Sequence, residues 1–139
     1  MVKFYLAHPF DTRERMKIWE QRVEKQYDIE IINPFYDIHR SDIIEVDAGR
    51  EDRYKILNPS NVVTKDVDAI KDSTGIIALI DGSLSYGTIM EIWIAHSLGK
   101  EVYLIITNGH EGHPWLRYCA TNVFTSLDDF ENTILKREN

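Results

Sequence analysis

The chain has 139 residues, of which 43% are hydrophobic and 28% are charged, as in one ordinary soluble domain with a single core. Its net charge of −7 argues against a nucleic-acid polymer as the partner, because tracking the phosphates requires clustered Lys and Arg. It contains no apolar run that could span a bilayer, no signal-peptide pattern and no pair of cysteines, so we expect a cytoplasmic protein without a membrane partner.

The first half of the chain alternates strand and helix patterns. Val2 to Ala7 and Ile29 to Ile32 are short runs of β-forming residues, and each predicts a strand. The segment between them predicts a helix from Arg13 to Tyr27. Its apolar members are Met16, Ile18, Trp19 and Val23. Phe35 to Asn58 has no clear period, which is typical of a functional loop, with a short helix expected near Arg50 to Leu57.

The second half continues the alternation. A helix is predicted from a cap at Ser60 to Lys71, and its buried face is expected to comprise Val63, Val67 and Ile70. The apolar run Gly75 to Ile80 is typical of a strand buried on both faces of a parallel sheet. A helix from Gly87 to Leu98 follows, with Gly99 as its left-handed cap. The remaining predicted elements are a strand at Glu101 to Ile106, a short helix at Trp115 to Ala120, a strand at Asn122 to Thr125 and a helix from Ser126 to about Lys136.

This order of elements predicts a single α/β domain over residues 1–139, a doubly wound sheet of about five mostly parallel strands with helices on both faces. Such sheets bind ligands beyond the carboxyl ends of their strands, where the strand order reverses. The ligand site is therefore expected between the segments Tyr5 to Asp11 and Asp81 to Glu91.

Glu91 is the candidate of greatest chemical interest. It lies one turn into the helix that starts near Gly87, where the helix dipole favours an ionised carboxylate. A positioned carboxylate is what covalent catalysis at a sugar carbon needs, because it can trap an oxocarbenium-like centre as an ester. The pattern alone is more typical of a surface glutamate that complements a helix N-terminus.

Two other motifs are weaker. The segment from Asp81 to Thr88 has the glycine spacing of a phosphate loop, but Thr88 stands where the lysine belongs, so we exclude an NTP-hydrolysing loop. Its Gly and Ser residues leave open a contact with a hydroxyl or a single phosphate. His110 and His113 lie three residues apart without a convincing third ligand, so no metal is expected, and no organic cofactor either.

Several segments taken together are more specific than any one of them. They are Tyr5-Leu6-Ala7 with Pro9-Phe10, Asp66, Asp81-Gly82, the run from Tyr86 to Ile92, and Ala95 with Gly99-Lys100. In this combination the chain resembles the nucleoside 2-deoxyribosyltransferase family, which includes related 5′-monophosphate N-glycosidases. The resemblance runs from Lys3 to about Phe130, is weak between Phe35 and Asn58, and is most specific around Glu91.

The resemblance implies roles for individual residues. Glu91 matches the nucleophile that forms a glycosyl-enzyme ester, Asp66 the acid that handles the leaving base, and Tyr5 the tyrosine that orients the nucleophile. It also implies a flavodoxin-like fold and a homo-oligomer whose sites are completed by a neighbouring subunit, with His113 as the matching contributor. The further substrate-binding residues that it implies are Ser85, Gly87, Asp81, Gly82, Pro9 and Phe10.

The sequence departs from the family pattern at three places. Ser85 stands where transferases often carry an aspartate for the sugar 5′-hydroxyl, and a serine suits a phosphate better than a like charge does. The glycosidases have a Gly-Ser turn and an arginine after strand one, where this chain has His8-Pro9-Phe10. Arg13 or Arg15 could supply the cation. Trp93 replaces a small residue two positions after the nucleophile.

These features favour deoxyribosyl transfer between nucleobases, with small-molecule partners: a nucleoside or nucleotide and a free base. Hydrolysis of a nucleoside 5′-monophosphate is the alternative, since both reactions pass through the same ester and differ in whether a base or water resolves it. A nucleotide-binding module without turnover is the second alternative. It predicts that replacing Glu91 with alanine leaves function intact.

Overall fold

The computed structural model describes residues 1–38, 43–45, 54–56, 58–83 and 85–137. Its main sheet has five strands in the order β2-β1-β5-β6-β7, and every neighbouring pair is parallel. The strands are β1 (Val2–Ala7), β2 (Ile29–Ile32), β5 (Gly75–Ile80), β6 (Glu101–Ile106) and β7 (Asn122–Phe124). A separate antiparallel ladder joins β3 (Ile43–Glu45) to β4 (Tyr54–Ile56).

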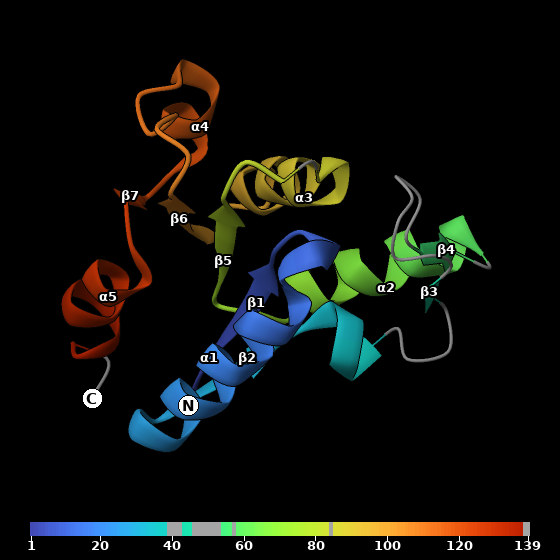
Figure 1. Cartoon of the computed structure of the whole chain (residues 1–139), viewed down its shortest axis with the longest axis horizontal. Coiled ribbons are helices and arrows are strands. Elements are labelled where there is room, and N and C mark those ends of the chain that lie inside the picture. Colours follow the sequence, from blue (N-terminus) through green and yellow to red (C-terminus); the bar gives the residue numbers. More distant parts are fainter. Residues whose placement is uncertain (39–42, 46–53, 57, 84, 138–139) are drawn as a thin grey trace.

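Helices connect these strands. They are α1 (Arg13–Gln26), α2 (Pro59–Lys71), α3 (Tyr86–Ser97), α4 (Pro114–Cys119) and α5 (Leu127–Phe130), with helical turns η1 (Phe10–Thr12), η2 (Pro34–Ile38) and η3 (Glu131–Leu135). Figure 1 shows α3 between α2 and α4, and α3 contacts both of them. No helix among the described residues is long and apolar enough to cross a bilayer.

The sheet is covered on both faces because successive side chains of a strand point to opposite sides. Phe4 and Leu6 of β1 belong to a core with α1, α5 and η3, whereas Tyr5 and Ala7 belong to a second core with α2, α3 and α4. Each face of β1 is therefore buried under helices. The predicted doubly wound α/β domain is confirmed.

The sheet order locates the ligand edge. Counting only the main-sheet strands along the chain, the order is 2-1-3-4-5, which is the flavodoxin-like arrangement. The order reverses between β1 and β5, which pair directly through Phe4 to Ala7. Crossovers leave β1 in one direction and β5 in the other, and the carboxyl ends of these two strands frame the expected ligand site.

The predicted bounds of β1, β2, β5 and β6 are confirmed, and so are two predicted caps. Gly99 has a φ of +72°, in the left-handed region that favours glycine after a helix. The Ser126 Oγ accepts the Asp129 amide proton at 3.1 Å, which opens α5.

Three predictions for the elements were wrong. Val63 was predicted on the buried face of α2 but is 58% exposed, because that face runs through Val62 rather than Val63. The cap of α2 is Asn58 rather than Ser60, since its side chain accepts the Asn61 amide proton and Pro59 suits the first helical position.

The third wrong prediction is the short helix near Arg50 to Leu57. Tyr54–Ile56 is instead the strand β4, in keeping with the strand preference of tyrosine and isoleucine. Residues 50–53 and 57 lie outside the described residues, as do 39–42 and 46–49 of the predicted loop.

Candidate active site

The ends of β1 and β5 and the start of α3 converge at one edge of the sheet. Tyr5 lies near the end of β1, Asp81 follows β5, and Glu91 lies in the second turn of α3. Asp66 comes from α2, which packs against α3 and β1. The predicted catalytic residues thus reach the site from three elements that are far apart in sequence.

Tyr5, Glu91 and Asp66 form one cluster. The Tyr5 hydroxyl donates a short hydrogen bond to Glu91 Oε2, and the Tyr5 side chain is completely buried. Asp66 acts on the same hydroxyl through its charge and a hydrogen bond, and its charge also acts on Glu91. The three residues that the sequence analysis named as catalytic are therefore in mutual electrostatic contact.

The electrostatics of Glu91 differ from the expectation. Its position near a helix N-terminus favours an ionised carboxylate, but burial, with the charge of Asp66, raises its pKa to about 8. The hydrogen bond from Tyr5 acts in the opposite direction and stabilises the carboxylate. Burial, together with the two carboxylates, raises the pKa of Tyr5 well above its ordinary value, so Tyr5 is a hydrogen-bond donor at neutral pH.

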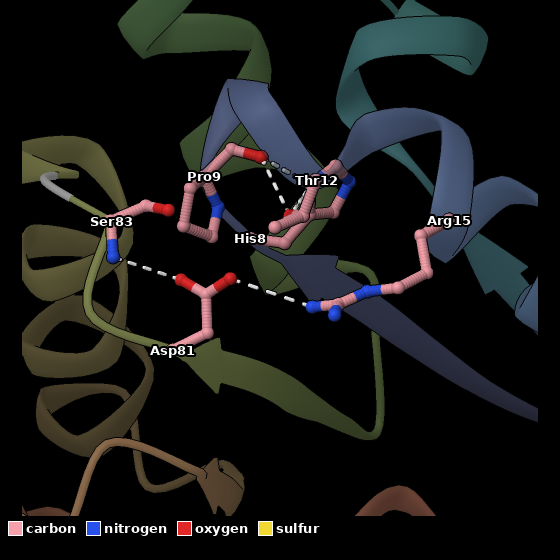
Figure 2. A network of polar contacts seen from close by, with 6 residues as sticks. All are labelled: His8, Pro9, Thr12, Arg15, Asp81 and Ser83. Atoms are coloured by element: carbon pink, nitrogen blue, oxygen red, sulfur yellow. Dashed lines mark hydrogen bonds and ion pairs between the residues drawn. The ribbon is translucent and has the colours of Figure 1, made fainter.

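Asp81 organises the end of β5. Its Oδ1 accepts the Ser83 amide proton at 3.0 Å, and its Oδ2 lies 3.4 Å from Arg15 Nη2 on α1 (Figure 2). Gly82, between Asp81 and Ser83, has a φ of +99°, which only glycine adopts readily. The turn thus holds a carboxylate and a guanidinium side by side at the strand end.

The predicted contact residues Pro9 and Phe10 form the turn after β1. The Pro9 carbonyl accepts the Thr12 amide proton at 3.1 Å and the Thr12 hydroxyl proton at 2.9 Å (Figure 2). The Arg13 guanidinium lies 3.9 Å from the centre of the Phe10 ring, and the Phe35 ring packs edge-on against Phe10. Of the two candidate cations, Arg15 faces the end of β5 whereas Arg13 stacks on Phe10.

Ser85 and Gly87 shape the start of α3. Ser85 is its N-cap, with Oγ accepting the Thr88 amide proton at 3.3 Å and lying 2.6 Å from the Thr88 hydroxyl oxygen. A Cβ at Gly87 would meet Glu91 Oε1 at 4.0 Å, so the absence of a side chain there keeps that side of the carboxylate open. The Ser85 hydroxyl thus caps α3, and Gly87 lies next to the Glu91 carboxylate.

His113 is not part of the Tyr5–Asp66–Glu91 cluster. It is the exposed N-cap of α4, where its Nδ1 accepts the Trp115 amide proton at 3.3 Å. His113 belongs to the start of α4 and Asp66 to α2, and α3 lies between these two helices (Figure 1). Within the described ranges, no three His, Cys, Asp or Glu side chains are placed to hold a metal ion.

An exposed aromatic face spans α3 and α4, and the sequence offered only Trp115 beside Pro114 as a candidate interface residue. We define this α3–α4 aromatic face by Trp93, His96, Trp115 and Tyr118, whose neighbouring ring centres are 5.0–6.2 Å apart. Trp115 and Tyr118 are each 68% exposed. Trp93 therefore turns toward α4. The recurrence of Tyr86, Met90 and Trp93 at helical spacing was the available signal.

Comparison with known proteins identifies relatives in fold. No protein-family model matches the sequence, and no curated protein matches it. The structure is similar to a 2-deoxyribosyltransferase of Bacillus psychrosaccharolyticus, with 22% identity, 99% of this chain and 96% of that chain covered, and a TM-score of 0.72. A 2-desoxiribosyltransferase of Leishmania mexicana is 18% identical over 100% of both chains, with a TM-score of 0.69. A CMP N-glycosidase of Clostridium botulinum is 19% identical over 97% and 96%, with a TM-score of 0.56. The structural similarity over nearly the whole chain shows a shared fold.

Proposed function

We propose that this protein breaks the N-glycosidic bond of a nucleoside through a covalent ester on Glu91 and transfers the sugar to a second nucleobase. The observation that carries the proposal is the Tyr5–Asp66–Glu91 cluster at the carboxyl ends of β1 and β5. Relatives in fold that are described as 2-deoxyribosyltransferases support the choice of reaction.

In the first half-reaction, an ionised Glu91 attacks the anomeric carbon while the bond from that carbon to the base nitrogen breaks. Asp66 supplies the proton that the departing base needs, and Tyr5 holds the Glu91 carboxylate in the attacking orientation. In the second half-reaction, a nitrogen of the acceptor base attacks the same carbon, the ester bond breaks, and the acceptor's proton returns to Asp66. Two inversions retain the configuration of the sugar.

The raised pKa of Glu91 suits this cycle. Two neighbouring carboxyl groups resist simultaneous ionisation, so the pair keeps one proton up to about pH 8. If substrate binding places that proton on Asp66, the site gains a nucleophile and an acid at once. The same pair can serve both half-reactions because the proton returns to Asp66 at the end.

A chromatographic assay tests the proposed reaction. Purified protein is incubated with deoxynucleosides and their 5′-monophosphates, each with and without a second free base. We expect a new nucleoside only when the acceptor base is present, and we expect Glu91→Gln to abolish it while the protein stays folded. Turnover in that variant would contradict the mechanism, and ligand binding without turnover in the wild type would indicate a binding module.

Hydrolysis of a nucleoside 5′-monophosphate is the second candidate, and one observation favours it. Arg15 of α1 reaches the end of β5, where its guanidinium pairs with the Asp81 carboxylate (Figure 2). An arginine there is suited to bind a phosphate, and one relative in fold is a CMP N-glycosidase. Release of base from a monophosphate without acceptor, lost in Arg15→Gln but not in Arg13→Gln, would establish this activity instead.

We also propose a homo-oligomer that buries the α3–α4 aromatic face against a second copy. Aromatic residues are enriched in the cores of protein interfaces, and large exposed apolar patches are unusual on monomers. The face shares α3 with Glu91 and shares α4 with His113. An interface there would bring His113 of one copy toward the site of the other, as the resemblance to the deoxyribosyltransferases implies.

A further inference from the structure

A chain of buried polar groups lies beneath the turn that carries Pro9 and Phe10. His8 is 2% exposed, Asn33 is 0% exposed and Glu20 is 1% exposed. His8 Nε2 lies 3.1 Å from Asn33 Oδ1, and Asn33 Nδ2 donates to Glu20 Oε1 at 3.1 Å. Ionisable side chains are rarely buried this completely without a partner, and the proposed reaction uses neither His8 nor Glu20.

The hydrogen bonds fix the proton positions on His8. Its Nδ1 lies 2.8 Å from the Pro9 carbonyl oxygen, which can only accept, so Nδ1 carries a proton. The orientation of the Asn33 carboxamide is set independently, because Phe35 N–H donates to Oδ1 at 3.3 Å. Nε2 therefore faces an acceptor as well. In this arrangement both ring nitrogens face acceptors, which is the arrangement that a doubly protonated ring satisfies.

The charges around His8 come from several elements. Asp81 at the end of β5 acts directly on the ring and raises its pKa, as do the hydrogen bonds to Pro9 and Asn33. Burial has the larger effect and lowers the pKa of His8 overall. The doubly protonated ring is thus expected on the acidic side of the ordinary histidine range.

Glu20 and two further charged groups, Lys17 and Asp37, lie next to Asn33 or to its partner. On α1, Lys17 Nζ is 3.3 Å from Glu20, and on η2 the Asp37 carboxylate accepts the Asn33 amide proton at 2.7 Å. Burial raises the pKa of Glu20 to about 7, opposed by Lys17 and the Asn33 hydrogen bond. Glu20 can therefore hold a proton near neutral pH, which makes it either an acceptor or a donor toward the carboxamide.

Loss of the Nε2 proton changes this arrangement. Two acceptors, Nε2 and Asn33 Oδ1, would then face each other, so the carboxamide has to turn over or move away. If the carboxamide exchanges the positions of Oδ1 and Nδ2, the hydrogen bond from Phe35 N–H to Oδ1 is lost and Oδ1 faces a protonated Glu20. The Phe35 ring packs 5.1 Å from the His8 ring and 5.3 Å from the Phe10 ring, so the change reaches the turn at the site.

We propose that His8 and Asn33 form a protonation-dependent latch beneath the site. While His8 carries both ring protons, it joins the Pro9 carbonyl to the Asn33 carboxamide and fixes the turn that carries Pro9 and Phe10. Release of the Nε2 proton to solvent opens the link between β1 and η2. His8 is in this sense a positioning residue, since it acts through Pro9, Phe10 and Phe35.

Nitrogen-15 NMR of the histidine rings tests the latch. The pH is lowered from about 8 to the lowest value at which the amide spectrum is still that of the folded protein. We expect His8, identified by its loss in His8→Gln, to pass from one ring proton on Nδ1 to two. The Asn33 side-chain amide and Phe35 N–H resonances should shift in the same transition. A ring that keeps a single proton throughout, or an Asn33 signal that ignores the transition, would overturn the proposal.

A variant gives the transition a predicted direction. Asn33→Asp keeps an acceptor for Nε2 and Phe35 N–H and adds a negative charge beside the ring, so the His8 transition should move up by about one pH unit or more. Asn58→Asp, the same change at the cap of α2, should leave the transition in place. An unmoved transition in a folded Asn33→Asp protein would contradict the latch, and the wild-type titration decides the question if that variant does not fold.

The consequence for substrate binding rests on the proposed function. Because Pro9 and Phe10 are predicted to contact the substrate, KM should change by several-fold across the His8 transition while kcat follows the Glu91 cluster. The two failures are distinguishable. Absence of turnover would contradict the proposed reaction without affecting the NMR result. A His8 protonation state that does not change with pH would contradict the latch without affecting the proposed reaction.

Discussion

At the scale of single residues, the protonation of Glu91 determines what the site can do. The carboxylate has to be ionised to attack a sugar carbon, yet burial and Asp66 raise its pKa to about 8. The hydrogen bond that Tyr5 donates to Glu91 opposes part of this rise in pKa. The account therefore makes predictions about pH that a purely structural role for these residues would not make.

The first prediction concerns Tyr5→Phe. With its hydrogen bond removed, the pKa of Glu91 should rise further, so the pair loses its last proton at a higher pH and the alkaline limb of the kcat/KM profile should move from about pH 8 to a higher value. The loss in kcat should be about 100- to 1,000-fold, as for the loss of one preorganised hydrogen-bond donor. Tyr103→Phe removes a hydroxyl that bonds Glu101 on β6 and serves as the matched control. A profile whose alkaline limb stays in place in Tyr5→Phe would refute the orienting role.

The second prediction concerns stability. Glu91 has a folded pKa of about 8, above the ordinary value of 4.5, so the stability it contributes is full below pH 4.5 and is lost as pH rises toward 8. Glu91→Gln removes this loss while keeping an acceptor for Tyr5. Urea unfolding should show the variant about 5 kcal/mol more stable than the wild type near pH 9, with little difference near pH 4.5. An equal difference at both pH values would contradict the assignment.

The residues of the cluster were predictable, but their electrostatics were not. Glu91 and Asp66 followed from the family resemblance, and the switch-point rule placed Tyr5 and Asp81 at the right edge of the sheet. The direction of the Glu91 pKa shift depends on side chains 25 and 86 positions away, which no local pattern reports. The His8–Asn33–Glu20 network was hidden for the same reason, since it joins three separate segments.

At the scale of elements, the short apolar strands were the most predictable features. Buried parallel strands are continuous runs of β-formers, so their limits are sharp, as in Val2–Ala7 and Gly75–Ile80. Helix phase was less certain, because Ile18 and Val63 are apolar residues on the exposed sides of their helices. The strand β4 escaped notice because three residues are too few for a period.

The third prediction tests the start of α3. Ser85→Ala removes the cap from the helix that carries Glu91 and should cost about 1 kcal/mol in the free energy of unfolding. Ser85→Asp keeps a capping oxygen and should restore that stability. The same variant adds a carboxylate at the position where transferases often carry one, so it should weaken the use of a monophosphate more than that of a nucleoside. Equal stability of Ser85→Ala and the wild type would show that the cap contributes little.

At the scale of the whole molecule, the flavodoxin-like sheet positions the Tyr5–Asp66–Glu91 cluster at one edge and leaves the α3–α4 aromatic face exposed in the single chain. The strand order and the comparisons agree on this fold. The order of elements was enough to predict it, because alternating strands and helices allow few other arrangements. Oligomeric assembly could not be predicted from such patterns, because an apolar side chain in the sequence does not reveal whether a core or a second copy covers it.

The fourth prediction concerns assembly. Trp115→Glu places a charge in the α3–α4 aromatic face, where Trp115 is 68% exposed in the single chain, so the fold should survive. Light scattering should show an oligomer for the wild type and a monomer for the variant, whereas Ile18→Glu on exposed α1 should not change the mass. A wild-type protein that is monomeric at about 100-fold above assay concentration would contradict the interface.

The most direct test of the central claim is a search for the ester itself. The protein is mixed with a deoxynucleoside in the absence of any acceptor base, quenched in acid, digested and analysed by mass spectrometry. The account predicts that the peptide containing Glu91 gains the mass of one deoxyribosyl group, and that Glu91→Gln shows no such gain. Turnover of the deoxynucleoside with an unmodified Glu91 peptide, or with the sugar on another residue, would contradict it.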